Sequence, residues 1–415
     1  MPKSTTSKSR GKGAAKRKDG KPYEGFPLFP HNTGRWCKNI RGKFHYFGKV
    51  VDNPEGKAAL EEFNRQWPYI SEGRVPPPNN VEGKATVADL CNGFRNAKRR
   101  LLESGELSPS TYTDYVNVCD MLVAELRDDR PLDDLRPDDF GKMRASMAKR
   151  WGPTTLKNEL NLVRIALKYG RDVGLIDRDL HRDMSLRPPK AKALRKARNE
   201  RGPLLFTADE IRRILASADV HLKAMVLLGL NGGLGNTDIA EMPQGAIDWE
   251  GGWLNYPRPK TEVPRRIPLW PETVEALRRS TAKRPEPKDS EDFGLAFVSR
   301  EGRRFVRLEP KIGTTDIFVR RDSIGERFRK LLHKLGINGR KGLGFYTLRR
   351  NFETVGGESR DQVAVDSVMG HVDGSMAAIY RQGISDDRLR AVVETVRAWL
   401  WPAEGERSER DEARE

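Results

Sequence analysis

The segment that decides the fold reads Phe345-Tyr-Thr-Leu-Arg-Arg-Asn-Phe352, and two short motifs follow it along the chain. They are Met369-Gly-His371 and, nine residues after the histidine, Tyr380 within Ala-Ile-Tyr-Arg. Far upstream lies Lys260-Thr-Glu-Val-Pro-Arg-Arg-Ile-Pro-Leu269, in which a turn around Lys260 leads into a short strand. Because Gly-His recurs in unrelated proteins, the specificity comes from the order of all four elements.

The charge of the chain indicates what kind of partner it has. Its 415 residues include 76 Lys+Arg against 59 Asp+Glu, which gives a formal net charge of +17. At roughly 100–200 residues per domain, this length predicts about two to four domains. A surplus of positive charge this large favours a polyanionic partner, either nucleic acid or an anionic membrane surface.

Three further observations exclude other classes of protein. The longest apolar run, Ala224–Leu230, is far shorter than the ~20 residues of a membrane-spanning helix. Residues 1–20 are basic but lack the apolar region of a secretory signal. The three cysteines are scattered, so neither a disulfide framework nor a zinc cluster is expected. We therefore expect a cytoplasmic, nucleoid-associated protein with no membrane partner.

The N-terminal part is predicted to hold an arm and a small module. Residues 1–22 are basic and rich in small polar residues, which predicts a disordered arm or a tail that only aids solubility. In a β/α module over 23–70, strands Arg35–Ile40 and Lys43–Phe47 are joined by an Arg41-Gly42 turn, and a helix covers Glu55–Trp67.

Basic residues alternate with aromatic ones along these two strands. They either face DNA or form the ordinary polar face of a half-buried hairpin, and the sequence favours neither. The candidates are Arg35, Lys38 and Lys43.

A proline-rich linker over 71–83 separates this module from a helical domain over 84–181. Four amphipathic segments with capping residues at their starts predict a helical bundle there. Residues 182–203 form a basic linker, which is expected either to follow DNA phosphates or to act as a plain hinge. Its candidate DNA contacts are Arg195, Lys196 and Arg198.

The third domain is predicted over 204–401 and begins with a capping box at Thr207–Glu210. Short strands near residues 253–256 and 265–269 alternate with helices, and the last helix covers 386–400. That helix either docks on a second copy of the chain or covers the core of its own domain. A charged tail over 402–415 completes the chain.

In order and spacing, the four motifs resemble the catalytic half of the tyrosine recombinase (phage integrase) family. The resemblance implies a multi-domain, mainly α fold with small β-sheets and a mixed α+β catalytic domain. It also implies that 84–181 is a helical, SAM-like core-binding domain that binds DNA, and, more weakly, that 23–70 is an arm-binding-like module.

The resemblance implies a role for each motif residue in phosphodiester transfer. Tyr380 is the nucleophile that forms a covalent 3′-phosphotyrosine, and Lys260 is the general acid for the leaving 5′ oxygen. Arg349 offers a planar fork for the phosphate, and its neighbour Arg350 is expected to contact the DNA backbone. His371 donates to a non-bridging oxygen or orients the tyrosine. This chemistry needs no metal and no cofactor.

The sequence departs from the family pattern at two catalytic positions. Gly235 stands where the family has an arginine, in Gly-Leu-Gly-Asn-Thr-Asp, and Tyr346 stands at the histidine of His-x-x-Arg. A tyrosine hydroxyl can still bond a phosphate. For the missing arginine, either Arg258 supplies another cation, or the amides at Gly235 and Asn236 bind the phosphate. A plain loss of function is the third alternative.

The sequence therefore predicts a site-specific DNA recombinase or integrase that closes around duplex DNA. By resemblance, it assembles on paired sites as a homo-tetramer through its C-terminal helix. The alternative is a catalytically degenerate member that serves as a DNA-binding regulatory or architectural protein.

Overall fold

The computed structural model describes residues 20–73, 76, 84–314, 317–337, 339–372 and 374–403. The expected basic arm (1–22), proline-rich linker (71–83) and charged tail (402–415) lie largely outside these residues. The chain divides into two compact units, which are described separately below: one runs to Leu194 and includes Pro310–Phe318, and the rest forms the other.

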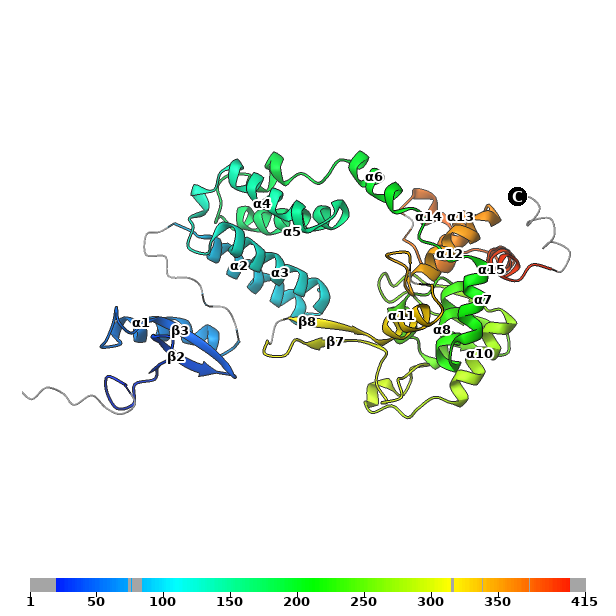
Figure 1. Cartoon of the computed structure of the whole chain (residues 1–415), viewed down its shortest axis with the longest axis horizontal. Coiled ribbons are helices and arrows are strands. Elements are labelled where there is room, and N and C mark those ends of the chain that lie inside the picture. The colour runs from blue at the N-terminus through cyan, green and yellow to red at the C-terminus, as the bar shows by residue number, and fades with distance from the viewer. Residues whose placement is uncertain are drawn as a thin grey trace, which may run out of the picture. The chain divides into compact units, whose positions relative to one another are not determined.

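The N-terminal module is a three-stranded antiparallel sheet in the order β1-β2-β3 with one helix (Figure 1). Arg41 and Gly42 both have positive φ, 53° and 79°, as a tight two-residue hairpin turn requires. The aromatic rings of Trp36, Phe47 and Phe63 are buried between sheet and helix. The elements are β1 (Phe29–Pro30), β2 (Arg35–Ile40), β3 (Lys43–Lys49) and α1 (Lys57–Ile70).

Four helices form the bundle that the sequence predicts for the next region. Each starts at a recognisable signal: Thr86 and Asp89 form a reciprocal capping box, Ser108 caps the second helix, and prolines open the last three. Their apolar faces share one core around Phe94, Phe140 and other residues. The helices are α2 (Val87–Glu103), α3 (Pro109–Leu126), α4 (Pro137–Arg150) and α5 (Pro153–Asp172).

The basic segment after the bundle contains a helix that the sequence analysis does not predict. Residues Ala191–Arg201 form α6, which has no buried residue. Alanine, leucine, lysine and arginine dominate it, and these residues are strong helix formers even without a core to pack on. The basic linker predicted over 182–203 therefore contains a helix.

The C-terminal unit combines a three-stranded antiparallel sheet, β4-β5-β6, with a shell of helices. Its strands are β4 (Ile247–Asp248), β5 (Trp253–Asn255) and β6 (Arg266–Pro268), and β7 (Val306–Pro310) and β8 (Phe318–Asp322) form a second sheet. The helices are α7 (Ala208–Ser217), α8 (Val220–Asn231), α9 (Asn236–Ala240), α10 (Pro271–Ala282), α11 (Ser323–Lys334), α12 (Thr347–Gly356), α13 (Gln362–Met369), α14 (Met376–Tyr380) and α15 (Asp386–Leu400). The 3₁₀ turns of this unit are η4 (Gln244–Ala246), η5 (Ser290–Asp292) and η6 (Gly357–Ser359). Those of the first unit are η1 (Leu132–Asp134), η2 (Leu180–Arg182) and η3 (Met184–Leu186).

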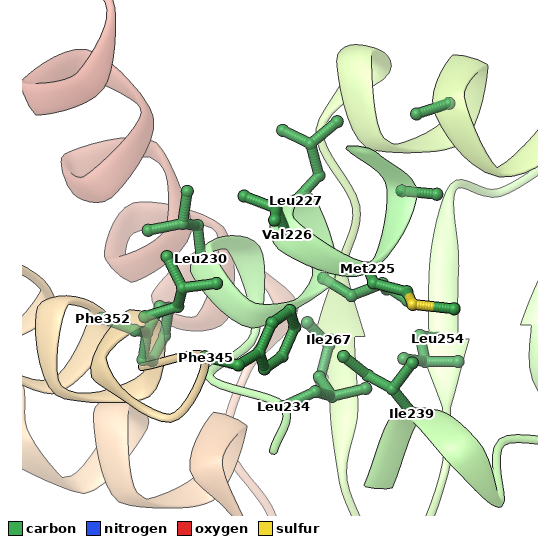
Figure 2. Packing of buried hydrophobic residues seen from close by; sticks show 14 of the residues in the cluster. Met225, Val226, Leu227, Leu230, Leu234, Ile239, Leu254, Ile267, Phe345 and Phe352 are labelled. Carbon is green, nitrogen blue, oxygen red and sulfur yellow. The ribbon is translucent and has the colours of Figure 1, made fainter. Parts of the chain in front are cut away.

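Helix α8 runs through the core of this unit, since nine of its twelve residues are buried. At its C-terminal end Leu234 lies beside Ile267 of β6 and Phe345, which precedes α12 (Figure 2). The chain segments around residues 234, 267 and 345 are therefore held together by one apolar core.

Helix α15 covers the core of its own domain. Its apolar face is buried, and the carbonyl of Val393 accepts a hydrogen bond from the indole of Trp270 at 3.0 Å. Of the two alternatives left open by the sequence, the structure therefore favours the intramolecular one for this face. No helix among the described residues is both long enough and apolar enough to cross a membrane.

Candidate active site

Arg349 lies in the first turn of α12 and is only 2% exposed. Its Nη1 donates to the carbonyl of Gly233 at 2.6 Å and its Nη2 to that of Met369 at 2.9 Å. Two residues on, the Asn351 amide bonds both the N–H and the carbonyl of Phe206, which fixes the helix. Burial lowers the pKa of the Arg349 guanidinium below its usual value, and the nearby charge of Arg258 adds to this effect.

Gly370 is the point on which three segments converge. Its φ of +65° ends α13, and a Cβ atom there would lie 2.8 Å from Cδ of Arg265 and 3.0 Å from Cβ of Arg258. Its carbonyl accepts hydrogen bonds from Nη1 of Arg258 and Oγ1 of Thr261, both at 3.3 Å. The turn after β5 is therefore docked on the Gly-His motif, and glycine is needed for both conformation and space.

Lys260 lies at the exposed tip of that turn. The hairpin continues beyond the regular strands, because the N–H of Arg258 donates to Val263 at 2.9 Å. Glu262 has a φ of +53°, a left-handed conformation that a non-glycine residue adopts only when its surroundings hold it. The lysine is thus presented on a braced turn.

His371 is half-buried and held by an acidic partner that the sequence analysis did not identify. Its Nδ1 lies 3.0 Å from Oδ1 of Asp366, and Oε2 of Glu353 is 3.9 Å away. Because a carboxylate can only accept, Nδ1 carries the proton and Nε2 is left to contact another group. Asp366 sits five residues before the histidine on α13, so its spacing alone gave no distinctive signal.

Tyr380 ends the short helix α14, and its side chain is 76% exposed. Among the hydrogen bonds of the described residues, none joins its hydroxyl to Arg349, His371 or Lys260. A hollow of about 340 Å³ is nevertheless lined by His371, by Val263 of the hairpin and by Arg381, the residue after the tyrosine. The segment that carries Tyr380 thus borders the same hollow as His371.

Position 235 is occupied by a glycine that the backbone does not require. Its φ is −89°, and a Cβ atom would meet the Tyr346 ring at 3.5 Å and Oδ2 of Asp238 at 3.7 Å, ordinary contact distances. The backbone N–H of Gly235, one of the two amides expected to bind the phosphate, is already engaged, because it donates to Asp238 at 2.9 Å. The side chain of Asn236 is likewise engaged, with the carboxylate of Asp322 at 2.8 Å.

The Tyr346 ring fills the space beside Gly235 while remaining 50% exposed. The two departures from the family pattern are therefore neighbours in space. A bulky ring at 346 occupies volume that a long side chain at 235 would otherwise share.

Arg265 completes the cluster, and the sequence analysis did not single it out. Its side chain is fully buried. Nε donates to the carbonyl of Tyr256 at 3.0 Å, and Nη1 approaches Oδ2 of Asp238 at 3.4 Å. Burial lowers the pKa of this guanidinium, and Asp238 opposes that shift. Only the fold could reveal this residue, since it is one of two adjacent arginines in a basic stretch.

The expected DNA contacts lie mostly on the surface. Arg350 is exposed, although it is adjacent in sequence to the buried Arg349. All three candidates on α6 are exposed as well, and the ammonium of Lys196 lies 3.8 Å from the carboxylate of Glu200. In the N-terminal module Arg35 and Lys43 are exposed. The ammonium of Lys38 instead lies over the rings of Phe63 and Trp67, at 4.8 and 5.3 Å from their centroids.

Comparison with known proteins shows what this arrangement is similar to. Residues 205–384 match the model of the phage integrase family. The fold resembles that of a lambda integrase dimer bound to a COC′ core site, with a TM-score of 0.53 at 17% identity over 87% of this chain and 97% of that one. It also resembles the Tn1549 transposon integrase in complex with a circular intermediate DNA, with a TM-score of 0.54 at 15% identity over 75% and 99% of the two chains.

Comparison with curated proteins found no match. The family model covers the segment that carries Gly235, Lys260, Arg349, His371 and Tyr380, and the fold similarity extends over most of the chain. Residues 205–384 are thus similar to the phage integrase family, and over most of the chain the fold resembles that of two integrases.

Proposed function

We propose that this protein is a site-specific DNA recombinase that breaks and rejoins DNA through a covalent 3′-phosphotyrosine. The Tyr380 oxygen attacks the scissile phosphorus, and the bond from phosphorus to the 5′ oxygen breaks. Lys260 gives a proton to that leaving oxygen, and the Tyr380 hydroxyl releases its own proton to solvent. Because the phosphotyrosine stores the bond energy, another 5′ hydroxyl can reverse the step and join a new strand.

The observation that carries this proposal is the guanidinium cluster around Gly370. Arg349 and Arg258 hydrogen-bond the adjacent carbonyls of Met369 and Gly370, directly before His371. Like charges held together inside a protein need an anion to balance them. Preorganised donors of this kind stabilise the charge that develops on a phosphoryl group during transfer.

Duplex DNA is the proposed partner, bound by four copies of the chain on paired sites. The net charge of +17 and the exposed arginines of α6 favour a long phosphate-lined contact. The fold also resembles a lambda integrase tetramer bound to a Holliday junction, with a TM-score of 0.51 at 18% identity over 89% of this chain and 98% of that one. The apolar face of α15 is already buried, so a contact between copies through this helix would use its polar face.

The test is the trapping of a covalent protein–DNA adduct. A duplex sequence is first selected by the protein from a random pool, and nicked duplexes based on that sequence then lose the short cleaved strand irreversibly. We expect the intact protein to form an adduct that survives denaturation, and Tyr380→Phe to bind the same duplex without forming one.

Tyr346→Phe serves as the matched control, since it removes a hydroxyl from the neighbouring tyrosine of the site. It should slow adduct formation without abolishing it. If the intact protein binds its duplex yet forms no adduct at any nick position, the DNA-binding regulatory or architectural role is the correct one.

A further inference from the structure

The missing arginine at position 235 leaves Asp238 available to another cation. A side chain at 235 would begin 3.7 Å from Oδ2 of Asp238. That oxygen already accepts the N–H of Gly235 and approaches Nη1 of Arg265. Arg265, which comes from a different segment, therefore approaches the same carboxylate that a side chain at 235 would border.

Local packing brings that segment to position 235. The Asn231 side chain at the end of α8 donates to the carbonyl of Pro268 and accepts from the N–H of Trp270, both at 2.8 Å. These bonds hold the glycine-rich turn after α8 against strand β6. Arg265 immediately precedes β6, and its aliphatic carbons pack against Gly370.

The charges in this cluster are not balanced. Arg258 and Arg265 both lie close enough to lower the pKa of Arg349, while Asp238 opposes the shift. Among these described residues around Arg349, one carboxylate therefore stands beside Arg349 and two further guanidinium groups. In addition, Nη2 of Arg265 is buried with no hydrogen-bond partner among the described residues. An ionised donor left unpaired in a protein interior is costly, which indicates that an anion completes the site.

We propose that Arg265 supplies the positive charge that the absent arginine at position 235 would bring to this site, acting behind the phosphate-binding groups and not as a phosphate ligand itself. This inference rests on the proposed function and names a positioning residue for the same reaction. Arg265 anchors Asp238 and adds positive charge behind Arg258 and Arg349, so that the two present their donors to the scissile phosphate.

The first test removes the arginine at position 265 and places one at position 235. Three variants are compared in single-turnover adduct formation on the nicked duplex: Arg265→Gln, Gly235→Arg and the double variant. We expect Arg265→Gln to slow adduct formation by about 10²–10³-fold, as loss of one preorganised donor does, with duplex affinity nearly unchanged. The double variant should regain at least about tenfold of that loss, because a guanidinium again reaches Asp238.

Arg266→Gln is the matched control. Arg266 is adjacent in sequence but pairs on the surface with Asp386 at 2.9 Å, so its loss should not change the rate. A merely structural role for Arg265 would not be rescued by an arginine on another element. The inference is overturned if Arg265→Gln keeps the rate of the intact protein, or if the double variant is no faster than Arg265→Gln.

A second measurement does not depend on activity. Thermal unfolding is followed in inorganic phosphate and in chloride at equal ionic strength. The intact protein should show a phosphate-specific rise in Tm that Arg265→Gln loses and the double variant regains. An equal rise in Arg265→Gln, or none in the intact protein, would overturn the inference. If the phosphate effect holds but no adduct forms, Arg265 serves an anion site and the proposed function falls instead.

Discussion

The arginine cluster and the tyrosine segment differ sharply in how the fold holds them. Arg349 is 2% exposed and hydrogen-bonded to two carbonyls on separate segments of the chain, and Arg265 is fully buried. Tyr380 ends a helix of five residues and is 76% exposed. Lys260 lies at the tip of an exposed turn.

In the proposed reaction, the buried arginines stabilise the developing charge, and the exposed segments bring the reacting groups to the phosphate. Guanidinium groups fixed in the interior need no reorganisation as charge develops on phosphorus. The proposed nucleophile and the proposed general acid lie on short exposed segments, which can adjust when DNA binds. The predictions below test this division, because changes to the buried part should affect both stability and rate, whereas changes to exposed residues should leave stability unchanged.

The largest effect is expected for Arg349→Ala. Adduct formation should fall by about 10³-fold or more, because a phosphate-binding arginine is removed. The carbonyls of Gly233 and Met369 also lose a charged donor, so unfolding free energy should fall by about 3 kcal/mol. Single-turnover kinetics and chemical denaturation measure the two effects. If stability is unchanged, the buried arginine is not part of the scaffold.

Gly370→Ala should have the next largest effect. A Cβ atom there meets Arg265 and Arg258 at 2.8 and 3.0 Å, and the φ of +65° is unfavourable for alanine. We expect a loss of about 1–3 kcal/mol in stability together with slower adduct formation. Gly245→Ala is the control, since a Cβ atom there meets nothing within 4 Å. Equal behaviour of the two variants would contradict the convergence on Gly370.

Asp366→Ala tests the orientation of His371. Without the carboxylate at 3.0 Å, the ring is free to turn and to change its tautomer. The rate of adduct formation should drop by roughly 10–100-fold, as when an orienting partner of a functional histidine is lost. Duplex affinity should be unaffected. A rate equal to that of the intact protein would show that His371 needs no such partner.

The smallest effect is expected for Arg350→Ala, at the exposed neighbour of Arg349. Cleavage should remain nearly intact, while duplex affinity weakens modestly and the slope of log affinity against log salt falls by about one. Binding titrations at several salt concentrations measure this slope. An unchanged slope would mean that Arg350 touches no phosphate.

Much of the fold could be predicted from local signals. The Arg41-Gly42 turn, the capping residues Thr86 and Thr207, and the apolar face of α15 act over a few residues, so the sequence reveals them. Helix α6 and strands β7 and β8 were missed. The first has no apolar periodicity, and the strands carry mixed polar residues.

The candidate site divides in the same way. Its motif residues could be proposed from their order, but Arg265 and Asp366 could not. The partner of Arg265, Asp238, is 27 residues away along the chain, and packing of the α8–α9 turn on β6 brings the two together. Such a pair has no sequence spacing of its own. The packing of the Tyr346 ring on Gly235 likewise became visible only in three dimensions.

The most direct test of the covalent mechanism is to identify the amino acid that carries the trapped DNA. After tryptic and nuclease digestion of the adduct, mass spectrometry should find the nucleotide on the peptide of residues 361–381, with the phosphate on Tyr380. A nucleotide on any other residue, including Tyr346, would contradict the mechanism.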